Sequence, residues 1–190
     1  TLYIGWENGQ IEALDARTGQ SQWATRFLVP SGRTDLERLV DIQAALLYQD
    51  GRLFALGYQG KVAALNPATG NFYWTRDVSG YRDMSVDAQA LYLVSDESEV
   101  LALDKMNGTV LWQQEALQGR YLIDVLTYDA NQLLTADRFG KVHWLDRVDG
   151  ALTGRVQISN DLGTGNAISR LWLDGNTLYT LDGDGYVKAY

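Results

Sequence analysis

The sequence predicts an all-β fold made of repeated four-stranded antiparallel sheets, and three observations carry this prediction. Five short apolar segments recur along the chain, and each begins with a leucine. A second fixed position follows 12 residues after every one of these leucines, without a gap. The intervals between successive leucines are 51, 38, 42 and 45 residues, which is the repeat length of a β-propeller blade. The paired positions are Leu2 and Leu14, Leu53 and Leu65, Leu91 and Leu103, Leu133 and Leu145, and Leu178 and Tyr190.

Two turns divide each repeat into strands. Seven residues after the leading leucine stands a residue suited to a tight hairpin with positive φ, which is Gly9, Gly60, Gly140 or Gly185, with Ser98 in the third repeat. A second hairpin turn runs from an acid or amide to a glycine four residues later, as in Asp15 to Gly19. The Asp or Asn side chain there can accept hydrogen bonds from the backbone amides of the turn.

A further apolar stretch precedes each leading leucine, so we expect four strands per repeat. These stretches are Ile42–Tyr48, Met84–Val86, Leu122–Tyr128 and Ile168–Leu173. The first repeat lacks its inner strand and the last lacks its outer strand, which gives 18 strands in a single partial propeller domain, an incomplete ring. The expected repeat units are 1-27, 40-78, 81-116, 120-158 and 166-190. A capping box at residues 34–37 also predicts one helical turn at residues 35–39.

Tryptophans mark the start of the outer strand in three repeats. Trp23, Trp74 and Trp112 each stand four residues after the glycine of the second turn, whereas the fourth repeat has Gly154 there. A large flat ring at a repeated position is suited to packing on a neighbouring sheet. We therefore expect the three tryptophans to dock each blade on the next.

Composition excludes several classes of function. The 16 basic and 24 acidic residues give a net charge of −8, which argues against binding to nucleic acid or to an anionic membrane surface. No cysteine is present, so disulfides, thiolate nucleophiles and Cys-ligated zinc are excluded. We expect no catalytic residue, no metal site and no cofactor. The single histidine, His143, is assigned no chemical role.

Two acidic segments have a structural and a functional interpretation each. Asp182-Gly183-Asp184-Gly185 is a hairpin turn or a fragment of a calcium loop, and the register of Gly185 favours the turn. The run from Asp96 to Glu99 is a solvated turn or an acidic patch for a partner.

The second turn with its tryptophan, ALDARTG and ALNPATG, resembles the pyrroloquinoline-quinone-type propeller repeat. Within that class the whole chain is similar to the BamB family, propeller lipoproteins of the outer-membrane β-barrel assembly machinery. Residues 37–41 and 53–62 carry this resemblance most specifically, together with the ending at residues 182–187. The family is an eight-bladed ring, so the resemblance implies its C-terminal half, a piece of a longer protein whose N-terminal lipid anchor lies outside this chain.

The resemblance also implies a function. It implies a non-catalytic scaffold at the periplasmic side of the bacterial outer membrane, which binds a POTRA domain of BamA. The implied contact residues lie at the exit of the long loop after the first repeat: Arg38, Leu39, Asp41 and Gln43. A quinoprotein dehydrogenase fragment and a polymer-binding propeller are the alternatives. Exposed blade edges are also expected to favour self-association.

Overall fold

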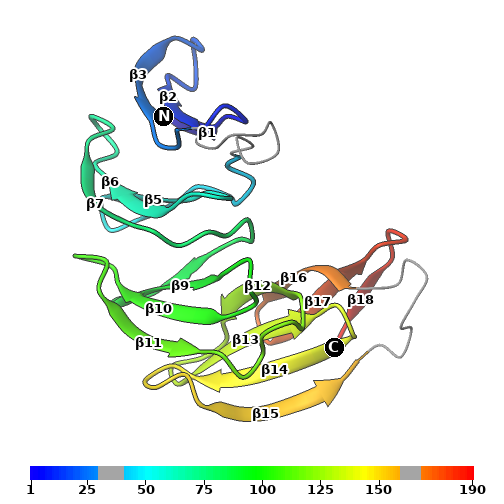
Figure 1. Cartoon of the computed structure of the whole chain (residues 1–190). Coiled ribbons are helices and arrows are strands. Elements are labelled where there is room, and N and C mark those ends of the chain that lie inside the picture. The colour runs from blue at the N-terminus through cyan, green and yellow to red at the C-terminus, as the bar shows by residue number, and fades with distance from the viewer. Residues whose placement is uncertain (30–40, 159–167) are drawn as a thin grey trace, which may run out of the picture. The chain divides into compact units, whose positions relative to one another are not determined.

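The computed structural model describes residues 1–29, 41–158 and 168–190. Within these residues the chain forms 18 β-strands and no helix, arranged as five antiparallel sheets of three, four, four, four and three strands (Figure 1). Strands that follow one another in sequence are neighbours in every sheet. The predicted all-β fold of 18 strands in antiparallel sheets is therefore confirmed. The helical turn predicted at residues 35–39 lies outside the described residues.

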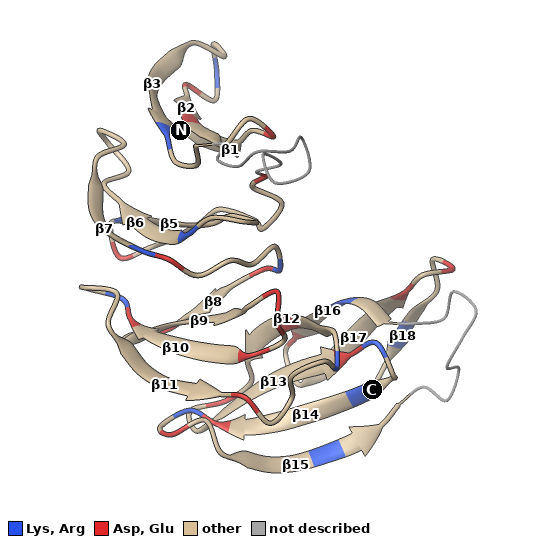
Figure 2. Cartoon of the chain, viewed as in Figure 1, with Lys and Arg blue, Asp and Glu red and all other residues tan. Residues whose placement is uncertain are grey.

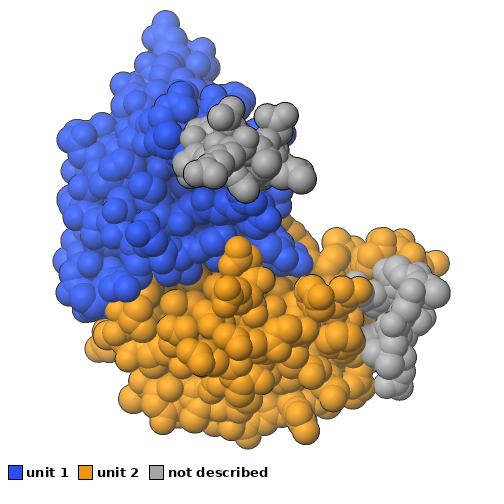
Figure 3. All heavy atoms as spheres, viewed as in Figure 1, with its two compact units in different colours: residues 1–82, 104–109 blue, residues 83–103, 110–190 orange. Residues whose placement is uncertain are grey.

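The chain divides into two compact units, residues 1–82 with 104–109 and residues 83–103 with 110–190 (Figure 3). The single domain expected from the sequence stays a prediction. The first unit holds the first sheet, β1 (Leu2–Gly5), β2 (Gln10–Leu14) and β3 (Ser21–Arg26), and the second sheet, β4 (Leu47–Gln49), β5 (Arg52–Leu56), β6 (Val62–Leu65) and β7 (Phe72–Arg76). It also includes the turn at residues 104–109.

The second unit holds the other three sheets. The third sheet consists of β8 (Ser85–Val86), β9 (Ala90–Val94), β10 (Val100–Asp104) and β11 (Val110–Gln114). The fourth consists of β12 (Leu122–Thr127), β13 (Gln132–Asp137), β14 (Lys141–Asp146) and β15 (Leu152–Gln157), and the fifth of β16 (Ile168–Asp174), β17 (Thr177–Asp182) and β18 (Val187–Ala189).

The middle strands are buried on both faces. Every residue of β6 and β9 is buried, and so is all of β5 after its first residue. Apolar side chains on both faces are what a sheet packed between two others requires. Charged residues lie mostly at the turns and strand ends (Figure 2). The described residues contain no helix that is long and apolar enough to cross a membrane.

The inner strand of the second sheet is shorter than the sequence suggests. The apolar run predicts a strand from about Ile42, but β4 begins at Leu47. Residues 42–46 instead follow a single backbone bridge between Asp41 and Tyr58. Ile42 is buried because its side chain lies against Gly5, where an added Cβ would come within 2.6 Å of it. Side-chain packing rather than strand pairing therefore accounts for this apolar stretch.

The first turn of each repeat follows the predicted backbone with one exception. Gly9, Gly140 and Gly185 have positive φ, and Ser98 adopts φ 67° at the same position. In the second repeat the positive φ falls on Gln59 instead of Gly60. Gly60 is needed for a different reason, since a Cβ there would collide with the side chain of Leu28.

The second turn forms as predicted in all four repeats that contain it. The side-chain Oδ1 accepts a backbone N–H two residues on, at 2.7–3.0 Å, and in two of the turns it also accepts the next N–H. In the first repeat these bonds, the Thr18 backbone N–H first among them, hold the pKa of Asp15 below its ordinary value. The accepting residues are Asp15, Asn66, Asp104 and Asp146.

Candidate functional site

Two of the four expected partner-contact residues belong to the described residues and two do not. Arg38 and Leu39 lie outside the described residues. Asp41 is half-buried and Gln43 is exposed. The Gln43 side-chain amide donates a hydrogen bond to Asp41 Oδ2 at 2.7 Å. The two residues that the resemblance pairs as a contact site are thus joined directly, and Gln43 orients the carboxylate.

Backbone bonds fix Asp41 to the second sheet. Its carbonyl accepts the Tyr58 N–H at 2.9 Å. Tyr58 lies in the turn between β5 and β6, so the Asp41 side chain is presented beside that turn. This bond uses the backbone of Asp41, and the hydrogen bond described for its carboxylate is the local one from Gln43.

The start of the long loop is held equally firmly. The backbone N–H groups of Phe27 and Leu28 both donate to the Gly9 carbonyl at 2.9 Å. The buried side chain of Leu28 fills the space beside Gly57 and Gly60, where an added Cβ would collide with it. Leu28 therefore lies against the turns of the first and second repeats.

An aromatic and basic cluster adjoins Asp41. The rings of Tyr58 and Tyr81 meet edge to face, with centroids 6.1 Å apart, and the guanidinium of Arg82 lies 4.7 Å from the centroid of Tyr81. Arg82 Nε is buried without a hydrogen-bond partner among the described residues. Tyrosine and arginine are enriched at the centres of protein interfaces. We call Asp41, Gln43, Tyr58, Tyr81 and Arg82 the Asp41 surface.

Sequence reasoning missed the three aromatic and basic members of the Asp41 surface. Tyr81 and Arg82 lie about 40 residues beyond Asp41 in the chain, and no motif links them. The one available signal is Tyr58, a large aromatic residue between two glycines in a turn that would ordinarily be polar.

The three repeated tryptophans occupy equivalent places. Each indole Nε1 donates to the backbone carbonyl of the residue after the Asp or Asn that opens the next second turn, at 2.9–3.0 Å. Each ring also lies over the glycine that ends that turn, where a Cβ would come within 2.5–2.6 Å of ring carbon Cε3. The three sets are Trp23 with Pro67 and Gly70, Trp74 with Lys105 and Gly108, and Trp112 with Arg147 and Gly150.

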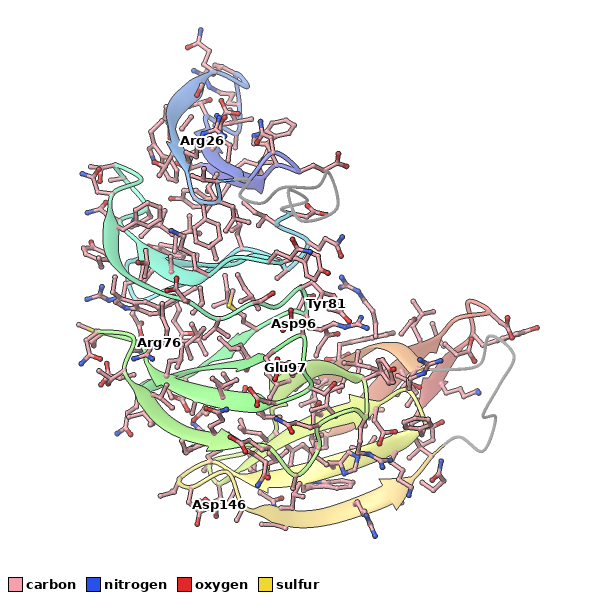
Figure 4. All side chains as sticks on the ribbon, viewed as in Figure 1. Arg26, Arg76, Tyr81, Asp96, Glu97 and Asp146 are labelled. Atoms are coloured by element: carbon pink, nitrogen blue, oxygen red, sulfur yellow. The ribbon has the colours of Figure 1, made fainter. Side chains whose placement is uncertain are left out.

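A second bond accompanies each tryptophan. The side chain two residues after it donates to the carbonyl of the same glycine: Thr25 to Gly70 at 3.0 Å, Arg76 to Gly108 at 2.5 Å and Gln114 to Gly150 at 2.8 Å (Figure 4). Three different residue types make this bond, so no recurring residue type in the sequence predicts it.

His143 lies at the centre of a buried polar group in the fourth sheet. Its Nε2 is 2.9 Å from Asp137 Oδ2, and Arg120 donates to the same oxygen through Nε at 2.6 Å. Burial raises the pKa of Asp137, but the hydrogen bonds from His143, the Lys141 backbone N–H and Arg120 outweigh it and lower the pKa overall. In the parts of the chain that the structure describes, no group of three or more acidic, histidine or cysteine side chains could hold a metal ion.

The acidic motif near the end of the chain is built as a turn. Asp182 Oδ1 accepts the Tyr186 backbone N–H at 2.9 Å, and Lys188 Nζ lies 3.3 Å from Oδ2. Gly185 has the φ of +85° that the hairpin requires. The carboxylate of Asp182 is thus engaged within its own hairpin.

Solved structures of similar fold define the class. BamB from Moraxella catarrhalis superposes with a TM-score of 0.87 at 28% identity and covers 98% of this chain and 54% of that one. The C-terminal WD40 domain of Sif2 superposes with a TM-score of 0.70 at 14% identity, which speaks to the fold alone. The protein is a β-propeller built of pyrroloquinoline-quinone-type repeats.

The sequence comparisons define the family within this class. The profile described as outer membrane protein assembly factor BamB matches residues 1–114, and the chain belongs to that family. It is 36% identical over 189 residues to the BamB of Alkalilimnicola ehrlichii and 31% identical over 157 residues to that of Escherichia coli, covering 99% and 83% of this chain. These matches cover 48% and 40% of the two relatives, so the chain spans about half the length of the curated proteins it matches.

Proposed function

We propose that this chain is part of a non-catalytic scaffold subunit that assists the assembly of outer-membrane proteins on the periplasmic side of the outer membrane. Membership in the BamB family is the observation that carries this proposal. The likeness to the M. catarrhalis protein, which extends over 98% of this chain, supports it independently. The partner that we propose is a POTRA domain of BamA, the contact that the family resemblance implies.

The Asp41 surface is the proposed contact. It combines a carboxylate held by Gln43, a pair of tyrosines and a buried guanidinium nitrogen without a partner among the described residues. The aromatic rings offer apolar contact area, while Asp41 offers one negative charge that selects a basic or amide group on the partner. Arg38 and Leu39, from the same loop, complete the proposed set.

Charge reversal at Asp41 tests the proposal. We expect Asp41→Arg to weaken binding to the isolated POTRA region by about tenfold or more, since inverting a charge at a polar contact costs about 2–5 kcal/mol when the pair is buried. The thermal midpoint should stay within about 2 °C of the parent because the backbone bond to Tyr58 remains. Calorimetry on both proteins, with the melting curves measured in parallel, provides the comparison.

A matched control separates the site from the overall charge. Asp174→Arg makes the same change at an exposed aspartate at the end of β16, and it should leave the affinity unchanged. Equal weakening in both variants would point to long-range electrostatics and reject Asp41 as a contact. Loss of folding in Asp41→Arg alone would make the residue structural.

A further inference from the structure

The second unit contains a cavity of about 330 Å³ that the proposed scaffold function does not use. It lies beside the segment that follows β11, the inner strand β14 and the outer strand β15. Its apolar wall consists of Ala116, Leu117 and Leu152, and its polar wall includes Arg120, His143 and Arg155. Binding pockets for small ligands have volumes of about 300–1,000 Å³, so this cavity has room for a small one.

The polar wall places a fully buried histidine in the fourth sheet. His143 stands ten residues after its leading leucine, where the other repeats have Glu12, Ala63, Leu101 and Lys188. Of these four residues only Ala63 and Leu101 are buried, and both are apolar. His143 is buried to the same degree, with an exposed fraction of 1%. A buried imidazole in place of an aliphatic side chain is costly unless its polar atoms are used.

Only part of the hydrogen-bonding capacity of this wall is used. A carboxylate can only accept, so Nε2 of His143 donates to Asp137 and the ring presents Nδ1 as its second polar atom. The hydroxyl of Thr135, the direct cross-strand neighbour of His143, is buried without a partner in the described chain.

The charges of the wall leave one positive charge in excess. Arg120 and the buried Asp137 form an ion pair at 2.5 Å and neutralise each other. Arg155 is exposed, is paired across the strands with His143 and makes no ion pair with any described residue. Among the arginines and the aspartate of this group, a single guanidinium, that of Arg155, therefore remains unmatched beside an apolar wall.

We propose that this cavity binds a monoanionic carboxylate carried on a short apolar body. The carboxylate would pair with Arg155, since a guanidinium matches the two oxygens of a carboxylate in geometry and charge. The apolar body would lie against Leu117 and Leu152. Such a group belongs either to a free aliphatic acid or to the C-terminal residue of a polypeptide, and both present the same chemistry to the cavity.

Calorimetry with hexanoate as the probe tests the proposal, with hexanamide as its uncharged match. We expect hexanoate to bind with a dissociation constant of about 1 mM. Hexanamide should bind at least about tenfold more weakly than hexanoate. Arg155→Gln should weaken hexanoate binding about tenfold without a change in thermal midpoint, because the side chain is exposed. Arg26→Gln, an exposed arginine on the outer strand β3, is the matched control and should bind as the parent does.

A short peptide ending in leucine, with a free or an amidated carboxyl terminus, distinguishes the two sources. A free-acid peptide that binds more tightly than hexanoate identifies a polypeptide terminus as the ligand, and the reverse order identifies a free acid. The proposal is overturned if hexanoate and hexanamide bind alike, if Arg155→Gln leaves the affinity unchanged, or if no heat is detected up to about 50 mM hexanoate.

Discussion

Single tryptophans make two interactions at once in this protein. Trp74 covers the glycine that ends the next turn and also donates its indole N–H to the Lys105 carbonyl. The ring contributes apolar contact, whereas the N–H satisfies a carbonyl that would otherwise be buried without a partner. A phenylalanine could supply ring contact but not the hydrogen bond, so we expect each tryptophan to stabilise the fold through both interactions.

Shortening Trp74 should therefore destabilise the protein in two separable steps. Trp74→Phe keeps an aromatic ring and loses the hydrogen bond, at a cost of about 1–3 kcal/mol. Trp74→Ala loses the ring as well, at about 3–5 kcal/mol. Urea titration measures both. Trp6→Ala is the control because Trp6 is 43% exposed and its indole N–H donates to the exposed Glu12 carboxylate, so loss of this side chain should cost under about 1 kcal/mol. Equal costs for Trp6→Ala and Trp74→Ala would reject the docking role.

Asp87 makes the stability of the second unit depend on pH. Burial raises the pKa of this carboxyl, but hydrogen bonds from the Ala90 and Gln89 backbone, the Tyr92 hydroxyl and Arg147 outweigh it and lower the pKa to about 2. A carboxyl with a lowered pKa in the folded state stabilises the protein above its unfolded pKa. That stabilisation is lost as the pH falls through the folded value.

The corresponding measurement is the urea midpoint between pH 5 and pH 2. In the parent protein the contribution of Asp87 should be complete at pH 5 and decline from about pH 4 towards pH 2. Asp87→Asn should lower the midpoint at pH 5 and flatten the decline below pH 4. Asp174→Asn, at an exposed position, should leave the curve unchanged. A decline of the same size in Asp87→Asn would assign the pH dependence to other carboxyls.

At the scale of the elements, strands and turns could be predicted because their spacing repeats. The leucine and its partner 12 residues later lie opposite each other in the ladder, as in Leu53 with Leu65. The contacts that could not be predicted involve no recurring residue type and no fixed spacing in the sequence. The bonds from Thr25, Arg76 and Gln114 use three residue types, and Gly60 is required by Leu28, a residue from another repeat. Those contacts depend on which segments meet in space.

Two glycines of the second turn separate backbone strain from ring contact. Gly19 and Gly70 hold the same place in successive repeats, and both have φ +72°. A Cβ at Gly19 meets nothing within 4 Å, whereas at Gly70 it would come within 2.5 Å of the Trp23 ring and the Thr25 hydroxyl.

Gly70→Ala should therefore cost more stability than Gly19→Ala. Gly19→Ala carries only the strain of a left-handed residue, about 1–2 kcal/mol. Gly70→Ala carries the same strain and also displaces Trp23, which we expect to add about 2 kcal/mol or more. The difference between the two unfolding free energies reports the contacts with the Trp23 ring and the Thr25 hydroxyl. If the two variants unfold at the same denaturant concentration, the tryptophan does not depend on the glycine.

At the scale of the whole molecule, the candidate sites show what sequence could supply. Asp41 and Gln43 could be proposed only through a family resemblance, and their mutual hydrogen bond emerges from the structure. The cavity beside His143 could not be proposed at all, because its walls come from residues 116–120, 143 and 152–155, which no motif connects. A lone histidine in a repeat is informative only after its neighbours are known.

The outer strands are the exposed part of the molecule. The middle strands β6 and β9 are fully buried, whereas every residue of β15 and of β18 is exposed. In the fifth sheet β18 pairs only with β17, so its second edge is unpaired among the described strands. Exposed apolar side chains lie on or beside this edge: Tyr186 at 67%, Val187 at 57% and Tyr190 at 46%.

An unpaired, apolar strand edge is a template for a second chain. We expect this chain to self-associate through β18 in a concentration-dependent way, measured by sedimentation velocity. Val187→Lys places a charge on the edge and should shift the equilibrium towards the monomer by about tenfold, because edge lysines oppose strand addition. Val148→Lys is the control, since Val148 is 86% exposed in the turn between β14 and β15 and does not belong to the fifth sheet. A parent protein that remains monomeric as its concentration rises would contradict this prediction. So would an equal shift in both variants, which would instead reflect the added positive charge.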